Sequence, residues 1–177
     1  VNSPHNPSGM VFSEDDMLQL QFLAKKHNLI VISDEVYEHI IFDGLTHYSA
    51  ARFSELASRS FIVASFGKTF HNTGWKMGYC LAPENLMNEF KKIHQYNVFS
   101  VNSPIQKALA TYLKTPEHYL SLPGFYQKKR DVFLELIKDS RFKIIPSKGT
   151  YFQMLDFSNI SNDHRIAYLY FHTLLLL

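Results

Sequence analysis

Lys68 is the side chain with the clearest capacity for chemistry. It lies in Ser-Phe-Gly-Lys-Thr at residues 65–69, directly after the apolar run 61–64. A second apolar run, residues 29–32, is soon followed by Asp34 and Tyr37. Ligands of open α/β sheets bind at the carboxyl ends of the strands, so we expect an amine, a carboxylate and a phenol at one edge. A lysine at such an edge, near an acid, favours Schiff-base chemistry.

A Schiff-base cofactor with a pyridine ring would need further groups around that amine. A carboxylate such as Asp34 can keep the ring nitrogen protonated, which makes the ring an electron sink. The amide of Asn6 and the hydroxyl of Tyr37 can donate hydrogen bonds to a phenolic oxygen on the ring. Once released from the cofactor, Lys68 could transfer a proton.

A phosphate on the same cofactor would need a hydroxyl and a cation, which Ser65 and Lys76 can supply. Both residues also have ordinary structural explanations. Ser65 could satisfy backbone groups, and Lys76 could be a solvated charge at a strand edge. Asp34 could likewise be a turn acid, so the argument depends on the whole set rather than on any one residue.

Strands and helices must position these side chains. Continuous apolar runs predict parallel strands covered on both faces at 29–33 and 61–65, and a third strand at 77–82. Capping and proline signals predict helices at 13–27, 53–58, 83–98, 103–113 and 116–139, the last with a kink at Pro123-Gly124. Two further strands, expected to be antiparallel, are predicted at 142–145 and 150–156.

Alternating helices and strands predict an α/β fold up to residue 112. We therefore expect a larger α/β unit over residues 1–112 and part of a smaller α+β unit over residues 113–177. The chain opens within a loop-like motif and closes on an apolar, helix-like segment at residues 166–177. These ends favour a piece of a longer protein.

Four motifs, in order along the chain, resemble those of the pyridoxal-phosphate-dependent class I/II aminotransferases of fold type I. They are Pro-His-Asn-Pro-Ser-Gly at 4–9, Ser-Asp-Glu-Val-Tyr-Glu at 33–38, Ser-Phe-Gly-Lys-Thr-Phe at 65–70 and Thr-Gly-Trp-Lys-Met-Gly-Tyr at 73–79. The resemblance covers residues 1–158 and is strongest to the kynurenine/glutamine and methionine aminotransferase branch. It implies an incomplete cofactor-binding large domain, with a mostly parallel sheet and flanking helices, plus part of the small domain.

The resemblance also implies a role for each candidate residue. Lys68 matches the Schiff-base lysine of pyridoxal 5'-phosphate, and Asp34 the partner of its ring nitrogen. The remaining matches bind the phenolic oxygen or the phosphate of the cofactor: Asn6, Tyr37, Ser65 and Lys76. Lys76 stands where many members have arginine, which keeps the charge but loses the bidentate grip on a phosphate.

The expected activity is transfer of an amino group from an amino acid to a 2-oxo acid, and the family implies a homodimer. Two alternatives stay open on the sequence. One is a carbon–sulfur β-lyase, which shares every motif because the same carbanion can expel a β-thiolate. The other is an inactive truncated remnant, because the family's upstream phosphate loop and ring-stacking aromatic precede the Asn6 motif, and its substrate-carboxylate arginine is not recognisable here.

Composition excludes several other classes of protein. A net charge of +2 without a basic block argues against a nucleic-acid partner. The C-terminal leucine run is too short for a membrane span. A single cysteine, Cys80, and the lack of a signal-like segment favour the cytoplasm. The histidines show no metal-ligand spacing, so we expect no metal site.

Overall fold

A computed structural model describes residues 1–161 of the chain. Its centre is a three-stranded sheet in the order β1-β2-β3, formed by Val31–Asp34, Ser60–Ser65 and Gly78–Leu81. β1 and β2 are parallel, with Val31 opposite Ser60. β3 runs antiparallel to β2, with Ser65 opposite Gly78. The sheet is therefore mixed: the parallel arrangement expected for the apolar runs holds for β1 and β2.

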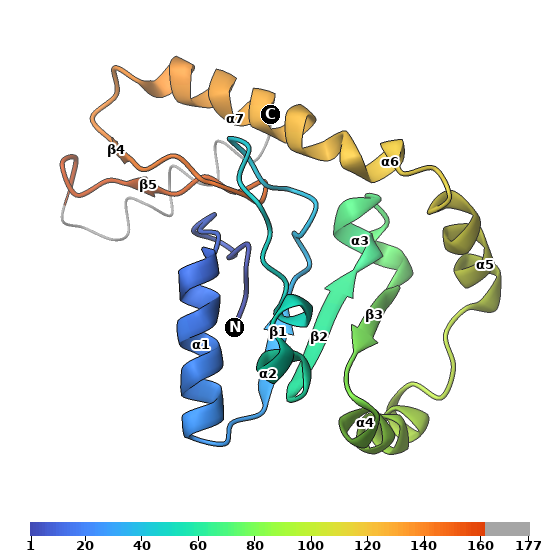
Figure 1. Cartoon of the computed structure of the whole chain (residues 1–177). Coiled ribbons are helices and arrows are strands. Elements are labelled where there is room, and N and C mark those ends of the chain that lie inside the picture. The colour runs from blue at the N-terminus through green and yellow to red at the C-terminus, as the bar shows by residue number, and fades with distance from the viewer. Residues whose placement is uncertain (162–177) are drawn as a thin grey trace.

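The direction of β3 follows from the connection before it. A parallel return would need a crossover along the sheet, usually through a covering helix. Residues 66–77 instead form two short helical segments at the end of β2, α3 (Phe66–Thr69) and the 3-10 turn η2 (Thr73–Trp75). The chain then comes straight back beside β2, as Figure 1 shows.

One face of the sheet carries the main apolar core. α1 (Glu14–Lys26) and α2 (Ser54–Ala57) supply Met17, Ala24 and Leu56, which cluster with Val31 and Ile62 of the sheet. The alternation of side chains along a strand sends the intervening residues to the other face. There Ile32 is 62% exposed, so among the described residues the expectation of strands covered on both faces is wrong for β1.

Further helices follow the sheet in the chain. On the second face, Phe61 meets Phe90 of α4 (Glu84–Asn97), with ring centroids 6.2 Å apart. Within residues 1–161 the other helices are η1 (Ala50–Arg52), which lies between β1 and β2 in the chain, and three that follow α4: α5 (Ser103–Tyr112), α6 (Glu117–Leu120) and α7 (Leu122–Ile137). The predicted kink at Pro123-Gly124 is displaced: the break falls at Ser121, and Pro123 lies in the first turn of α7, where proline costs no helical hydrogen bond. None of the helices within residues 1–161 is both long and apolar enough to cross a membrane.

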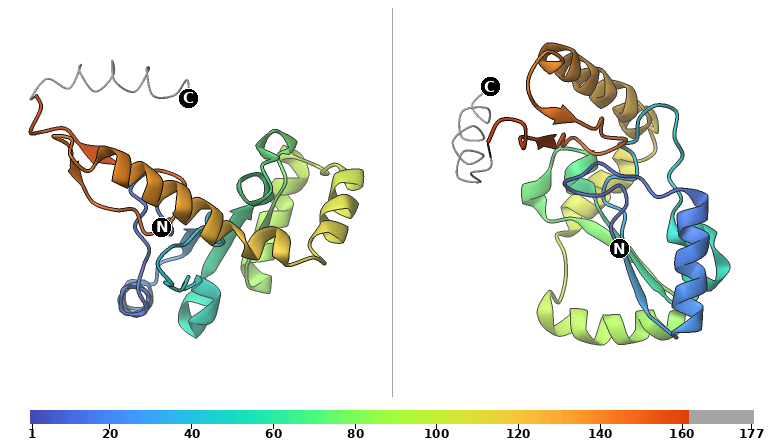
Figure 2. Two further views of the ribbon diagram at one scale, coloured as in Figure 1. Left: turned by 90° about the horizontal axis from the view of Figure 1, so that it is seen from above. Right: turned by 90° about the vertical axis from the view of Figure 1, so that its left-hand side faces the viewer.

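A second, two-stranded sheet joins β4 (Lys143–Ile144) to β5 (Leu155–Asp156), antiparallel as expected. β5 is shorter than the predicted strand at 150–156 because the backbone just before it forms hydrogen bonds with another part of the chain. The N–H of Thr150 donates to the carbonyl of Ile40, and the N–H of Phe42 donates to that of Lys148. The small sheet lies at the opposite end of the molecule from α5, and α7 runs across much of the distance between them (Figure 2). The predicted helix-like segment at 166–177 lies outside the described residues.

Candidate functional site

The carboxyl ends of β1 and β2 open onto a pocket of about 580 Å³. Five of the six side chains singled out in the sequence line it: Asn6, Asp34, Tyr37, Ser65 and Lys68. The parallel pairing of β1 with β2 explains this convergence, because it puts both carboxyl ends at one edge of the sheet. The structure thus brings together an amine, a carboxylate, a phenol, an amide and a hydroxyl from three separate segments.

Lys68 is held by the single helical turn α3. The Ser65 hydroxyl caps this turn: its Oγ accepts the N–H of Gly67 at 3.1 Å and donates to the carbonyl of Met77 at 3.3 Å. The Lys68 side chain is half-buried, and within residues 1–161 its amine makes no hydrogen bond or ion pair. Its donors therefore face the pocket unengaged.

Asp34 is fixed from both sides of its backbone. Its N–H donates to the carbonyl of Val1, and its carbonyl accepts the side-chain amide of Asn2 at 2.9 Å. Its carboxylate takes one backbone donor, the N–H of Val36, at 3.2 Å. Within residues 1–161 the half-buried carboxylate makes no further hydrogen bond, so it can accept one from a proton-bearing group in the pocket.

Tyr37 forms a buried wall of the pocket, with 2% of its surface exposed. Burial, and then the hydroxyl of Tyr151, raise the pKa of the Tyr37 phenol well above its ordinary value, while the side chain of Asn6 acts in the opposite direction. The phenol is therefore protonated at neutral pH and can donate a hydrogen bond. Its ring meets Tyr151 edge-on at 5.3 Å, which fixes its orientation.

Lys76 is placed differently from the other five candidates. It is exposed, follows η2 in a left-handed conformation (φ 55°), and does not belong to the residues that line the pocket. Asn2 and His5, which the sequence analysis did not single out, do line it. Their signal was present, since both lie within the same turn-rich segment as Asn6.

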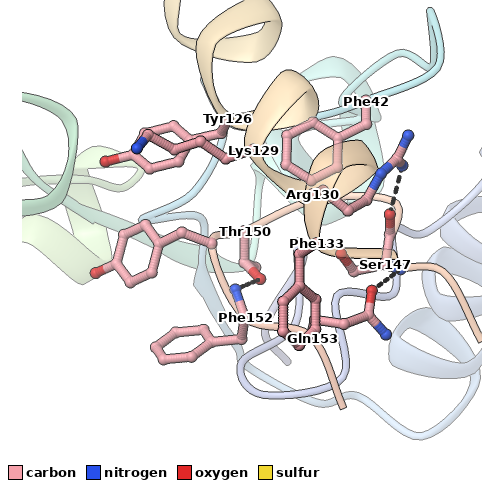
Figure 3. Close-up of a pocket in the computed structure, with 10 residues that line it drawn as sticks. Phe42, Tyr126, Lys129, Arg130, Phe133, Ser147, Thr150, Phe152 and Gln153 are labelled. Carbon is pink, nitrogen blue, oxygen red and sulfur yellow. Dashed lines mark hydrogen bonds between the residues drawn. The ribbon is translucent and has the colours of Figure 1, made fainter. Parts of the chain in front are cut away.

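Figure 3 shows a second cavity, of about 200 Å³. Half of its lining residues are aromatic, among them Tyr126, Phe133 and Tyr151. Arg130 lies at one side, where its guanidinium donates to the carbonyl of Ser147 at 2.7 Å and to the carboxylate of Asp43. Tyr151 therefore connects the two cavities, because its ring also contacts Tyr37.

Comparisons with known proteins identify the family of the chain. The family "Aminotransferase class I and II" matches residues 1–172, and the chain belongs to that family. Its fold is that of the fold-type I aminotransferases.

Two curated relatives illustrate the similarity. The chain is 49% identical over 162 residues to the methionine aminotransferase of Escherichia coli, covering 91% of this chain and 42% of that protein. It is 39% identical over 165 residues to the kynurenine–oxoglutarate transaminase of Dictyostelium discoideum, covering 90% and 38%. The chain thus spans about two fifths of the length of these relatives.

Solved structures give the same result for the fold. The methionine aminotransferase structure from Escherichia coli superposes with a TM-score of 0.89 at 47% identity, covering 94% of this chain and 44% of that chain. The N-succinyldiaminopimelate aminotransferase of Mycobacterium tuberculosis also gives 0.89, at 33% identity, covering 95% and 44%.

Class I/II aminotransferases of this fold use pyridoxal 5'-phosphate. The donor set of the larger pocket fits that group. An unengaged amine suits its aldehyde, a partly free carboxylate suits its ring nitrogen, and a protonated phenol beside an amide suits its phenolic oxygen. The pocket also has the size of a small-molecule or cofactor site.

Proposed function

We propose that the protein containing this chain transfers an amino group from an amino acid to a 2-oxo acid, with pyridoxal 5'-phosphate as cofactor. The observation that carries the proposal is the presence of Lys68 and Asp34 in one pocket at the strand ends. The names of the similar proteins favour methionine or kynurenine as the amino donor, and the sequence resemblance adds glutamine-type amino acids. A homodimer in the cytoplasm remains part of the proposal.

The residues have distinct tasks in this reaction. Bound pyridoxal phosphate would supply an aldehyde that condenses with amines and a ring that withdraws electrons. The amine of Lys68 would hold the aldehyde, and would also take the proton from the substrate α-carbon and return it as a general acid. Asp34 would keep a proton on the ring nitrogen, because its negative charge favours the protonated ring.

Binding and orientation would fall to the other side chains. Tyr37 and Asn6 donate hydrogen bonds to the phenolic oxygen, which their place in the pocket supports. Ser65 offers a hydroxyl to the phosphate, but would then exchange its present bond to the carbonyl of Met77 for that oxygen. Lys76 is the proposed phosphate cation, and would have to turn toward the pocket from its exposed position.

The test is covalent capture of the cofactor by the 177-residue chain. Incubation with pyridoxal phosphate should produce the visible absorbance of a lysine Schiff base, and borohydride should then leave a pyridoxyl group on Lys68, located by peptide mass spectrometry. Lys68→Ala should abolish the band, whereas Lys92→Ala, at an exposed lysine paired with Glu89, should keep it. A label on other lysines, or an unchanged band in Lys68→Ala, would remove Lys68 from the proposed mechanism.

A further inference from the structure

A group of metal-ligating side chains lies outside the cofactor pocket. Glu35, Glu38 and His47 each place a ligand atom within 4.8 Å of the other two. None of the three belongs to the lining of the larger pocket described above. The set is well shielded, because the exposed fractions of the side chains are 3% for Glu35, 24% for Glu38 and 12% for His47.

The fold holds these residues in place without a ligand. Glu35 and Glu38 belong to the turn that follows β1, where the N–H of Glu38 donates to the carbonyl of Glu35 at 2.9 Å. The Glu35 carboxylate accepts the hydroxyl of Ser33 at 2.8 Å and the N–H of Ala50 at 2.9 Å. His47 comes from the segment just before η1, with Nε2 2.8 Å from the second oxygen of Glu35.

Two shielded carboxylates so close together repel one another and call for positive charge. Within residues 1–161, however, no lysine or arginine forms an ion pair with either of them. The nitrogen groups nearest to them are imidazoles: His47 beside Glu35, and His39, whose Nε2 is 3.8 Å from Glu38. Two carboxylates without a lysine or arginine partner in this part of the chain favour the binding of a divalent cation.

The donor atoms have capacity left for a metal. Both recorded contacts of Glu38, to Tyr79 and to His39, involve Oε1, so Oε2 has no recorded partner within residues 1–161. Nδ1 of His47 is buried and has no hydrogen-bond partner among the same residues. A cavity of about 290 Å³ reaches the cluster and is lined by Glu38, His39 and His47, so an ion has a path to the site.

The spacing is close to that of a bound ion. Ligand atoms about 2.1 Å from a tetrahedral zinc lie roughly 3.4 Å from one another. The side chains would therefore close by little more than an ångström, which rotations about side-chain bonds can supply. Imidazole and carboxylate ligands together suit zinc and its neighbours in the first transition row rather than magnesium or calcium.

We propose that Glu35, Glu38 and His47 form a binding site for a divalent transition-metal ion of the zinc class, with water completing the coordination. This proposal replaces the expectation of no metal site. It does not depend on the proposed aminotransferase activity, because the cluster uses none of the residues assigned to the cofactor.

The test is calorimetric titration of the cofactor-free, tag-free 177-residue chain with zinc chloride, and with cobalt chloride as a spectroscopic probe. We expect one zinc per chain and a visible cobalt spectrum of the intensity typical of a four- or five-coordinate ion. Glu38→Gln and His47→Gln should each weaken zinc binding at least tenfold. His94→Gln, which changes a histidine of α4, should leave the affinity unchanged.

Two controls keep the result interpretable. Circular dichroism and urea unfolding of each variant separate loss of a metal ligand from loss of the fold. We expect Glu38→Gln to disturb the fold less than His47→Gln, because Glu38 is the least buried of the three residues. Absence of zinc binding to the folded chain, or equal affinity in Glu38→Gln and the unsubstituted chain, would overturn the proposal. Loss of binding in His94→Gln would assign the ion to α4 instead and would also overturn it.

Discussion

Gly67 shows how little room surrounds the lysine of the candidate site. It is buried between Ser65 and Lys68, and a Cβ atom added to it would lie 2.7 Å from the Cα of Thr73. The obstacle is backbone, which cannot swing aside as a side chain can. The close approach of α3 to the start of η2 therefore requires a residue without a side chain at this position.

Gly67→Ala should consequently destabilise the fold and displace Lys68. We expect a loss of about 1–3 kcal/mol, as for other insertions into tightly packed regions, measured by urea unfolding. Gly74→Ala is the matched control, because nothing lies within 4 Å of a Cβ added there. Equal free energies of unfolding for the two variants would show that residues 67–73 can move to accommodate the added methyl group without loss of stability.

The candidate residues differ in how far the sequence could place them. Asp34 ends β1 and Lys68 lies in the turn after β2, and the apolar runs of both strands are easy to recognise. The parallel pairing of these strands then brings the two residues to one pocket. The position of Lys76 depends on a left-handed turn after η2, which no local pattern announces. The contact of His47 with Glu35 depends on the path of the intervening segment, so it became visible only in the folded chain.

At the scale of elements, α1 is the helix whose beginning is best determined by local chemistry. The Ser13 hydroxyl accepts the N–H of Asp16 at 3.2 Å, and the Asp16 carboxylate accepts the N–H of Ser13 at 2.9 Å. This reciprocal capping box satisfies two donors that the helix cannot satisfy internally. The Ser13 hydroxyl also donates to the Asp16 carboxylate at 2.7 Å, and this bond, followed by the one from the Ser13 N–H, lowers the pKa of Asp16.

Ser13→Ala should remove one half of this capping box. We expect a loss of about 1 kcal/mol in the free energy of unfolding, the usual cost of deleting a serine cap. Ser140→Ala, at an exposed serine beyond the end of α7, should change stability by much less. If both variants unfold at the same urea concentration, the Ser13 cap does not contribute the expected stability.

Local sequence signals predicted the positions of helices better than they predicted how the strands pair. The capping box, and the proline before α4, mark helix starts at Glu14 and Glu84 close to the predicted positions. The direction of β3 and the length of β5 were harder, because both depend on where neighbouring backbone finds its hydrogen bonds. For β5 the decisive partner is the carbonyl of Ile40, more than a hundred residues earlier in the chain.

At the scale of the whole molecule, Arg130 connects α7 to the part of the chain that carries the sheet. Its side chain is 8% exposed and donates to both carboxylate oxygens of Asp43 at 2.7 Å. Its guanidinium also lies over the ring of Phe42, 4.9 Å from the centroid. The proposed boundary at residues 112 and 113 would thus be spanned by a bidentate ion pair, which a lysine could not reproduce.

This ion pair predicts a dependence of stability on pH. The hydrogen bonds from Arg130 lower the pKa of Asp43 from its ordinary value; burial opposes this effect, and the charge of Arg130 adds to it. A lowered carboxylate pKa stabilises the fold at pH above the unfolded value and loses that effect as pH falls through the folded value. Asp43→Asn should therefore cost about 1–2 kcal/mol at pH 7, a modest figure because Asp43 is 48% exposed.

Urea unfolding of the chain and of Asp43→Asn between pH 7 and pH 2 measures this effect. The two stability curves should converge at the acid end, where Asp43 is protonated in both the folded and the unfolded state. Asp139→Asn, at an exposed aspartate, serves as the control. A difference that stays constant down to pH 2 would show that Asp43 acts through shape rather than charge.

The mixed direction of the sheet also has a consequence for the order of assembly. Ser65 pairs with Gly78 across a short loop, whereas Val31 pairs with Ser60 only after the longer crossover through η1 and α2. Longer loops cost more entropy to close and slow the contacts that need them. We therefore expect the β2–β3 pair, which carries Lys68, to form before β1 brings Asp34 beside it. The pocket would then be among the last features of the molecule to become complete.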